Sequence, residues 1–154
     1  MNKPLVIIES PLSAPDAAGR AANVEYAVRC LRDSLRRGEA PFASHLAYSR
    51  GIAEAVLVRC ECAMPAPVSF GALDDANPDD RKLGMEAGFA WMRAADRQVV
   101  YVDRGVSAGM KAGIKAFVRA KWEVRPFGYD AQHLNGRPLI EIIGPYIDFR
   151  SLDG

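Results

Sequence analysis

The stretch that decides the fold runs from Gln98 to Ala116 and reads QVVYVDRGVSAGMKAGIKA. An apolar run at 99–102 ends at Asp103, and a glycine-rich turn containing Ser107 leads into a segment of helical character near Met110. A strand that passes through such a turn into a helix brings free backbone N–H groups to one point, which attracts anions, phosphate above all. Tight turns also need glycine for steric reasons alone, so a turn without a ligand stays an alternative.

Further apolar runs and amphipathic segments extend this strand–helix alternation in both directions. We expect strands at 5–8, 40–44, 55–62, 98–103, 123–127 and 139–143, and helices at 23–38, 79–95 and 111–121. Asn23 is the expected N-cap of the first helix. Such alternation indicates a parallel sheet with helices on both faces. The sequence therefore predicts one Rossmann-like α/β domain over residues 1–154, with a mainly parallel sheet of about five strands flanked by helices. An inserted loop or hairpin is expected at 49–72 and a C-terminal extension at 128–154.

The composition is that of an ordinary globular chain. Its 154 residues carry a net charge of +1, so bulk electrostatics favours neither nucleic acid nor a membrane as partner. No apolar run approaches the roughly 20 residues of a membrane span, and the first residues lack the three-part layout of a signal peptide. Cys30, Cys60 and Cys62 suit no zinc module by number or spacing. We therefore expect a cytoplasmic protein with no metal and no cofactor.

Polar side chains cluster where the expected strands end. Ser10, His45 and Ser107 each follow the end of a different strand. In open parallel sheets, ligands bind in the crevice beyond the carboxyl ends of the strands. These three segments are therefore expected to face one crevice.

Several short motifs, each weak alone, keep a common order and spacing over residues 3 to 127. They are Ser10-Pro11, Asn23-Val24-Glu25, Ser44-His45-Leu46-Ala47-Tyr48, Leu73-Asp74-Asp75 with Pro78 and Arg81, Gly88-Phe89-Ala90-Trp91 with Asp96, and Gly105-Val106-Ser107-Ala108-Gly109-Met110. In these motifs the chain resembles the nucleoside 2-deoxyribosyltransferase-like superfamily, and within it a branch of small proteins often found in phage genomes. The resemblance implies a protein that handles nucleosides or nucleotides.

In that superfamily, the members that cleave N-glycosidic bonds use a glutamate that attacks the anomeric carbon of the sugar and forms a glycosyl-enzyme. That glutamate follows the phosphate-binding serine by six residues. The resemblance implies that Ser107 holds the phosphate, together with Gly105, Gly109 and Met110, and that the glutamate position falls on Gly113. The nucleophile is therefore missing from its usual place.

Three interpretations follow from this departure. The chain binds a nucleotide without cleaving it, it cleaves with another carboxylate, or it binds something else. Glu9 at the end of the first strand and Asp103 at the end of a later one are the candidate catalytic carboxylates. A carboxylate placed like Glu9 is more often solvated or paired with a nearby arginine, and Asp103 could equally touch a ribose hydroxyl, pair with Arg104 or cap the following turn. Ser10 and His45 are candidates for contacts with sugar or base, and a merely hydrogen-bonded His45 is the alternative.

Two further expectations concern the oligomeric state of the protein and the effect of a substitution at Gly113 on its stability. The apolar stretches at 52–70 and 139–149 would expose much apolar surface on so small a domain, which predicts a homodimer or a larger homo-oligomer. Changing Gly113 to Glu is expected to cost little stability, since Glu is a better helix former than Gly by roughly 0.5–1 kcal/mol when its side chain has room.

Overall fold

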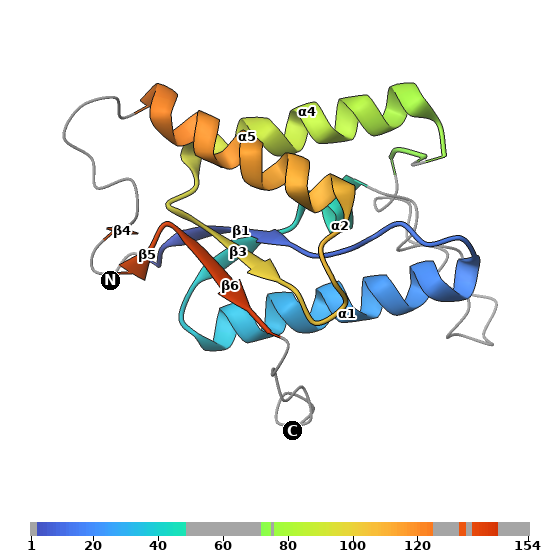
Figure 1. Ribbon diagram of the computed structural model, residues 1–154, viewed down its shortest axis with the longest axis horizontal. Coiled ribbons are helices and arrows are strands. Elements are labelled where there is room, and N and C mark those ends of the chain that lie inside the picture. The colour runs from blue at the N-terminus through green and yellow to red at the C-terminus, as the bar shows by residue number, and fades with distance from the viewer. Residues whose placement is uncertain (1–2, 49–71, 75, 125–132, 135–136, 145–154) are drawn as a thin grey trace.

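Figure 1 shows the helices and strands of the chain and how they are arranged. The computed structural model of the protein describes residues 3–48, 72–74, 76–124, 133–134 and 137–144. The elements are β1 (Leu5–Glu9), α1 (Ala17–Arg36), β2 (Ala40–Phe42), α2 (Ser44–Tyr48), α4 (Pro78–Ala94), β3 (Arg97–Tyr101), α5 (Ala108–Val124), β4 (His133–Leu134), β5 (Arg137–Pro138) and β6 (Ile140–Ile143). The strand expected at 55–62 lies outside the described residues, as do almost all of 49–72 and much of 128–154.

One parallel sheet of four strands organises the fold. Its order is β2-β1-β3-β6, and every neighbouring pair is parallel. The α/β prediction is confirmed, with four strands in this sheet among the described residues where about five were expected. From β1 the chain moves outward to β2, then returns past β1 to β3 and β6. The direction of winding therefore changes between β1 and β3, and the carboxyl ends of these two strands are where such sheets bind ligands.

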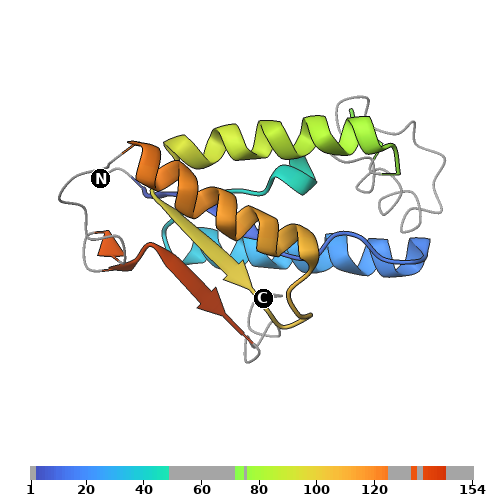
Figure 2. The same cartoon turned by 45° about the horizontal axis from the view of Figure 1, so that its top comes forward.

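Helices cover both faces of this sheet. Figures 1 and 2 show α1 on one face and α4 with α5 on the other. Side chains along β1 alternate between the two layers, as they do in any strand. Val6 and Ile8 belong to the apolar cluster that packs on α1, whereas Ile7 belongs to the cluster that packs on α4 and α5. By the same alternation, Glu9 faces the layer of α4 and α5.

The first helix begins earlier than its sequence pattern indicated. Asp16 is its N-cap, and one carboxylate oxygen accepts a hydrogen bond of 2.6 Å from the backbone N–H of Gly19. The assignment of Asn23 as N-cap is therefore wrong. Asn23 is buried inside α1, and its side-chain amide donates to the carbonyls of Leu12 (3.1 Å) and Ser13 (3.3 Å). It ties the loop after β1 to the helix.

The helix after β3 ends later than expected. Residues 123 and 124 belong to α5, so the strand expected at 123–127 is wrong there, and its remainder lies outside the described residues. Lys121 is buried near the end of this helix, and its ammonium group donates to the carbonyls of Ala95 and Arg93 at the end of α4. This contact holds the last turns of α5 against α4. No helix within the described ranges is long and apolar enough to cross a membrane.

Candidate functional site

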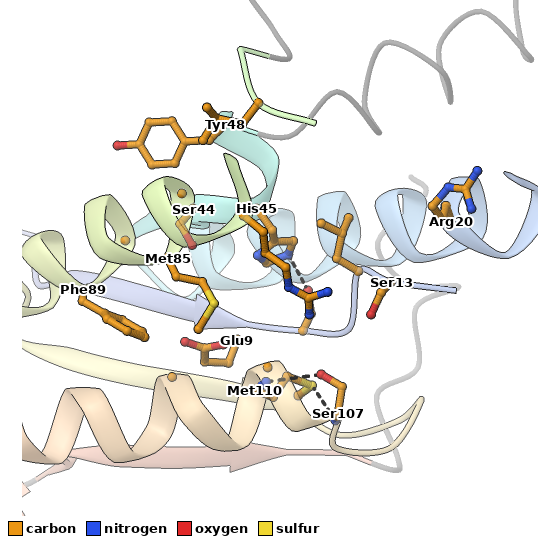
Figure 3. Close-up of a pocket in the computed structure, with 18 of the residues that line it drawn as sticks. Glu9, Ser13, Arg20, Ser44, His45, Tyr48, Met85, Phe89, Ser107 and Met110 are labelled. Atoms are coloured by element: carbon orange, nitrogen blue, oxygen red, sulfur yellow. Dashed lines mark hydrogen bonds between the residues drawn. The ribbon is translucent and has the colours of Figure 1, made fainter. Parts of the chain in front are cut away.

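A cavity of about 420 Å³ opens where the winding of the sheet changes direction. The end of β1 forms its floor, and the loop after β1, helix α2, helix α4 and the first turns of α5 surround it (Figure 3). Among the predicted site residues, those that line it are Glu9, Ser10, His45, Ser107, Gly109 and Met110. The expectation that three strand ends face one crevice is confirmed in this geometry.

Glu9 lies at the centre of the cavity. Its carboxylate oxygen Oε1 accepts a hydrogen bond of 3.1 Å from Nε2 of Gln98, a fully buried side chain on β3. Burial raises the pKa of Glu9 to about 8, although the hydrogen bond from Gln98 opposes the rise. At neutral pH the carboxyl group is therefore mostly protonated.

Gly113 on α5 makes room for this carboxyl group. A Cβ atom at position 113 would lie 2.3 Å from Oε1 of Glu9 and 2.7 Å from its Cδ. These separations are far below van der Waals contact, so any side chain at 113 has to displace Glu9. The expectation that a glutamate at 113 costs little stability assumed room for its side chain, and in the native background the carboxyl group of Glu9 occupies that room.

Ser10 and His45 form a hydrogen-bonded pair beside Glu9. The Oγ of Ser10 and the Nε2 of His45 are 2.9 Å apart, and the tautomer of the imidazole decides which of them donates. Burial lowers the pKa of His45 to about 4. The imidazole is therefore neutral above pH 5 and can accept a proton from the serine or from a bound hydroxyl group.

The start of α5 is closed by its own residues. Oγ of Ser107 accepts a hydrogen bond of 3.2 Å from the backbone N–H of Met110, and the N–H of Ser107 points to Sδ of Met110 at 3.4 Å (Figure 3). Ser107 thus acts as a helix cap. The N–H of Met110, expected to face a phosphate, is already engaged, so a phosphate would have to displace the cap or use the other N–H groups of the first turn.

Two predicted site residues lie away from the cavity lining. Asp103 follows β3, and its carboxylate accepts a 2.6 Å hydrogen bond from the hydroxyl of Tyr26 on α1. It is therefore engaged with the opposite layer of the molecule. Gly105 is exposed and has a φ of +82°, so it supplies the left-handed residue of the turn. Neither residue is brought to Glu9.

Several charged lining residues were given no site role by the sequence analysis, although Asp74 and Arg81 stand in the motifs quoted there. Arg20 and Arg81 bring positive charge from α1 and α4, and Asp74 brings a carboxylate. With Glu9 and His45 neutral, these charges leave the described lining with an excess of positive charge at neutral pH. Arg20 was missed because the first helix was expected only from residue 23, since its helical period becomes visible only from Val24.

Helix α4 contributes an apolar wall. Met85, Phe89 and Met92 line the cavity, with Gly84 and Gly88 on the same helical face. A Cβ atom at Gly88 would lie 2.9 Å from the side chain of Ser44, so this glycine allows α2 to pack closely on α4. Gly84 and Gly88 are four residues apart in the sequence, which places them on one face of the helix, and this spacing could have indicated that other segments pack closely there.

The fold and the cavity define an α/β protein with a cavity at the change of winding in its sheet. A family model described as a domain of unknown function, DUF7768, matches residues 4–71 and 52–127, and the chain belongs to that family. The curated proteins and the solved structures include no match. The function must therefore be argued from the site.

Proposed function

We propose that the cavity binds a nucleoside phosphate and that Glu9 carries chemistry at the N-glycosidic bond. One observation carries this proposal. The carboxyl group of Glu9 occupies the space in front of Gly113, the position on which the glutamate of the deoxyribosyltransferase-like enzymes falls by resemblance. In this interpretation the strand β1 supplies the carboxyl group that the helix α5 lacks.

The two ends of the cavity support a ligand of this class. Met85 and Phe89 lie on one side of Glu9, and Ser13 and Ser107 lie on the other, in Figure 3. An aromatic base suits the apolar side, whereas hydroxyl groups suit a phosphate. A susceptible bond between base and sugar would then lie near Glu9.

The charge of the lining supports an anionic ligand. When Glu9 is protonated, Asp74 is the only fixed negative charge among the described lining residues, whereas Arg20 and Arg81 each bring a positive charge. Guanidinium groups suit phosphate oxygens because they present several donors in a planar fork. His45 and Ser10 are placed to contact the sugar or the base.

Base release tests the proposal. Wild-type protein is incubated with deoxynucleosides and their 5′-monophosphates, and free base is measured by chromatography. We expect release from monophosphates and a loss of at least about 100-fold in Glu9→Gln, as for removal of an acid–base group. Glu86→Gln on the exposed side of α4 is the matched control and should keep full activity. Equal activity of wild type and Glu9→Gln would contradict a role for Glu9.

A nucleotide-binding module without cleavage is the second candidate. It is favoured by the raised pKa of Glu9, since a protonated carboxyl group is a poor nucleophile at neutral pH. This function predicts that nucleotides raise the melting temperature without base release. Ser107→Asp should abolish the stabilisation by charge repulsion. A protein that responds to no nucleotide would instead be an interaction protein with a vestigial pocket.

A further inference from the structure

The carbonyl oxygen of Gln98 is a buried acceptor that lacks a donor among the described residues. Gln98 is fully buried in β3, and its Nε2 donates to Oε1 of Glu9, while its own Oε1 has no hydrogen-bond partner there. Buried acceptors of this kind are rare in folded proteins because losing contact with water is costly. The orphan atom belongs to the same amide group that already holds Glu9.

A protonated carboxyl group resolves this mismatch. A carboxylate only accepts hydrogen bonds, whereas a carboxylic acid also carries one O–H donor. A primary amide and a carboxylic acid are complementary, since the amide N–H can donate to the acid carbonyl while the acid O–H donates to the amide carbonyl. The acid form of Glu9 would therefore offer the kind of donor that the carbonyl oxygen of Gln98 lacks.

We infer that Glu9 stands in the cavity as a neutral acid paired with Gln98, and that it serves as the proton donor to a leaving base rather than as the attacking carboxylate. This inference rests on the proposed function and narrows the substrate class to nucleotides whose base needs a proton to depart. Gln98 is the positioning residue. Burial acts in the same direction, because it disfavours the charged form of Glu9.

The proposed step balances as a hydrolysis. The bond between the anomeric carbon and the base nitrogen breaks, and its electron pair stays with the base. A base nitrogen takes the proton of Glu9, which becomes a carboxylate that still accepts from Nε2 of Gln98. Water adds its oxygen to the anomeric carbon, and the proton it loses returns to Glu9. The products are a free base and a sugar phosphate.

The other titratable groups of the described lining are few. His45 from α2 is neutral above pH 5, so it does not change charge where Glu9 titrates. Arg20 from α1, Arg81 from α4 and Asp74 carry the other charges of this lining, to which the hydroxyl group of Tyr48 from α2 also belongs. The residues of α5 and β3 nearest the carboxyl group, Gly113 and Gln98, are uncharged.

Isotope-edited infrared spectroscopy of the full chain tests the protonation state without any substrate. With ¹³C-labelled glutamate, we expect an acid C=O band at pH 7 that titrates near pH 8, is absent in Glu9→Gln and persists in Glu86→Gln. In Gln98→Leu the band should move to higher frequency, because the acid loses its hydrogen bonds. If all glutamates are ionised at pH 7, the inference is overturned. Glutamine has nearly the shape of glutamic acid, so Glu9→Gln should fold like wild type. The comparison of the acid band in these two proteins therefore tests the inference even if Gln98→Leu does not fold.

Kinetics then distinguish a proton donor from a nucleophile. A donor predicts that kcat falls about tenfold per pH unit above pH 8, whereas a nucleophile predicts that kcat rises up to that pH. Glu9→Gln should slow release of adenine by about 10²–10⁴-fold but spare an N7-methylated purine nucleotide, whose cationic base leaves without a proton. Equal loss on both substrates overturns the donor role and leaves the proposed function intact. If wild type cleaves neither substrate although the acid band is present, the proposed function and the donor role fail together, while the acid–amide pair stands.

Discussion

Glu9 and Gly113 act as a complementary pair, one supplying a carboxyl group and the other the space for it. A glycine inside a helix is less favourable than alanine by about 1 kcal/mol. Here the missing side chain has a steric reason, because Oε1 of Glu9 lies 2.3 Å from where a Cβ would be. The pair therefore couples a strand to a helix through one contact.

This coupling predicts a change of sign in a double-mutant cycle. In the native background, Gly113→Ala should destabilise the protein by about 1–3 kcal/mol, as overpacking does. In the Glu9→Ala background, the same substitution should stabilise it by about 1 kcal/mol through helix propensity. Urea unfolding of the four proteins measures both effects. Destabilisation of the same size in both backgrounds would show that Glu9 is not the obstacle.

Glu9 also predicts how stability changes with pH. Its pKa is about 8 in the native protein and near 4.5 in the unfolded chain, so the native state binds more protons between these values. The stability contributed by the acid form is complete below pH 4.5 and is lost as pH rises to 8. At about 1.4 kcal/mol per pH unit the loss reaches up to about 5 kcal/mol. Glu9→Gln should therefore become progressively more stable than wild type over this range in urea unfolding, whereas Glu86→Gln should follow wild type.

His45 acts in the opposite direction on the acid side. Its pKa is about 4 when folded and 6.5 when unfolded, so its contribution is complete above pH 6.5 and is lost as pH falls to 4. The loss amounts to about 3 kcal/mol. His45→Gln, which keeps a polar group near Ser10, should flatten this limb of the pH–stability curve. An unchanged acid limb would mean that the pKa of His45 is the same in the native and the unfolded protein.

At the scale of elements, a buried ion network joins the edges of the sheet at the end away from the cavity. Arg97 on β3 is 1% exposed and contacts Oε1 of Glu39 at 2.9 Å, the carbonyl of Pro138 at 2.9 Å and the carboxylate of Glu141 on β6. Arg37 at the end of α1 contacts both glutamates, at 2.8 and 3.1 Å. The network therefore links α1, β3 and β6.

Breaking this network should destabilise the fold while leaving the cavity unchanged. Arg97→Met removes one of the two cations that contact the fully buried Glu39, and a broken buried pair typically costs about 3–5 kcal/mol. Glu39→Gln in the Arg97→Met background should recover part of the loss, because it removes the stranded charge. Urea unfolding measures the effect, and nucleotide-induced stabilisation should persist in the folded variants. A loss below 1 kcal/mol would indicate that Arg37 alone neutralises Glu39.

The sequence predicted elements best where one local pattern decides them. The strand Arg97–Tyr101 and the helix after it follow from an apolar run and a glycine-rich turn, and the predicted run at 139–143 became β6. The start of α1 was missed because Pro15 and Gly19 resemble loop residues, whereas a single side-chain cap from Asp16 begins the helix. Contacts between elements, such as Lys121 on the end of α4, leave no trace in local periodicity.

At the scale of the whole molecule, the strand ends seen in the sequence were enough to predict which segments line the crevice. They were not enough to predict how the side chains in the crevice pair with one another. Ser10, His45 and Ser107 were placed correctly because the carboxyl ends of parallel strands share one edge. The pairing of Glu9 with Gln98 depends on which residues of two strands face the same layer and on their register, Ile7 opposite Gln98 and Glu9 opposite Val100. That register exists only once the sheet is assembled.

Assembly of the whole molecule is the last prediction. In the described part of the chain, the edge strand β6 pairs only with β3, and Ile142 on it is 68% exposed. An apolar edge strand favours association with another chain. We expect light scattering at micromolar concentration to give at least twice the chain mass of 16.8 kDa. Ile142→Lys should lower that mass toward the monomer, whereas Leu35→Lys, at a similarly exposed position on α1, should leave it unchanged. A monomer mass for wild type would refute the assembly, and an oligomer insensitive to Ile142→Lys would place the interface away from β6.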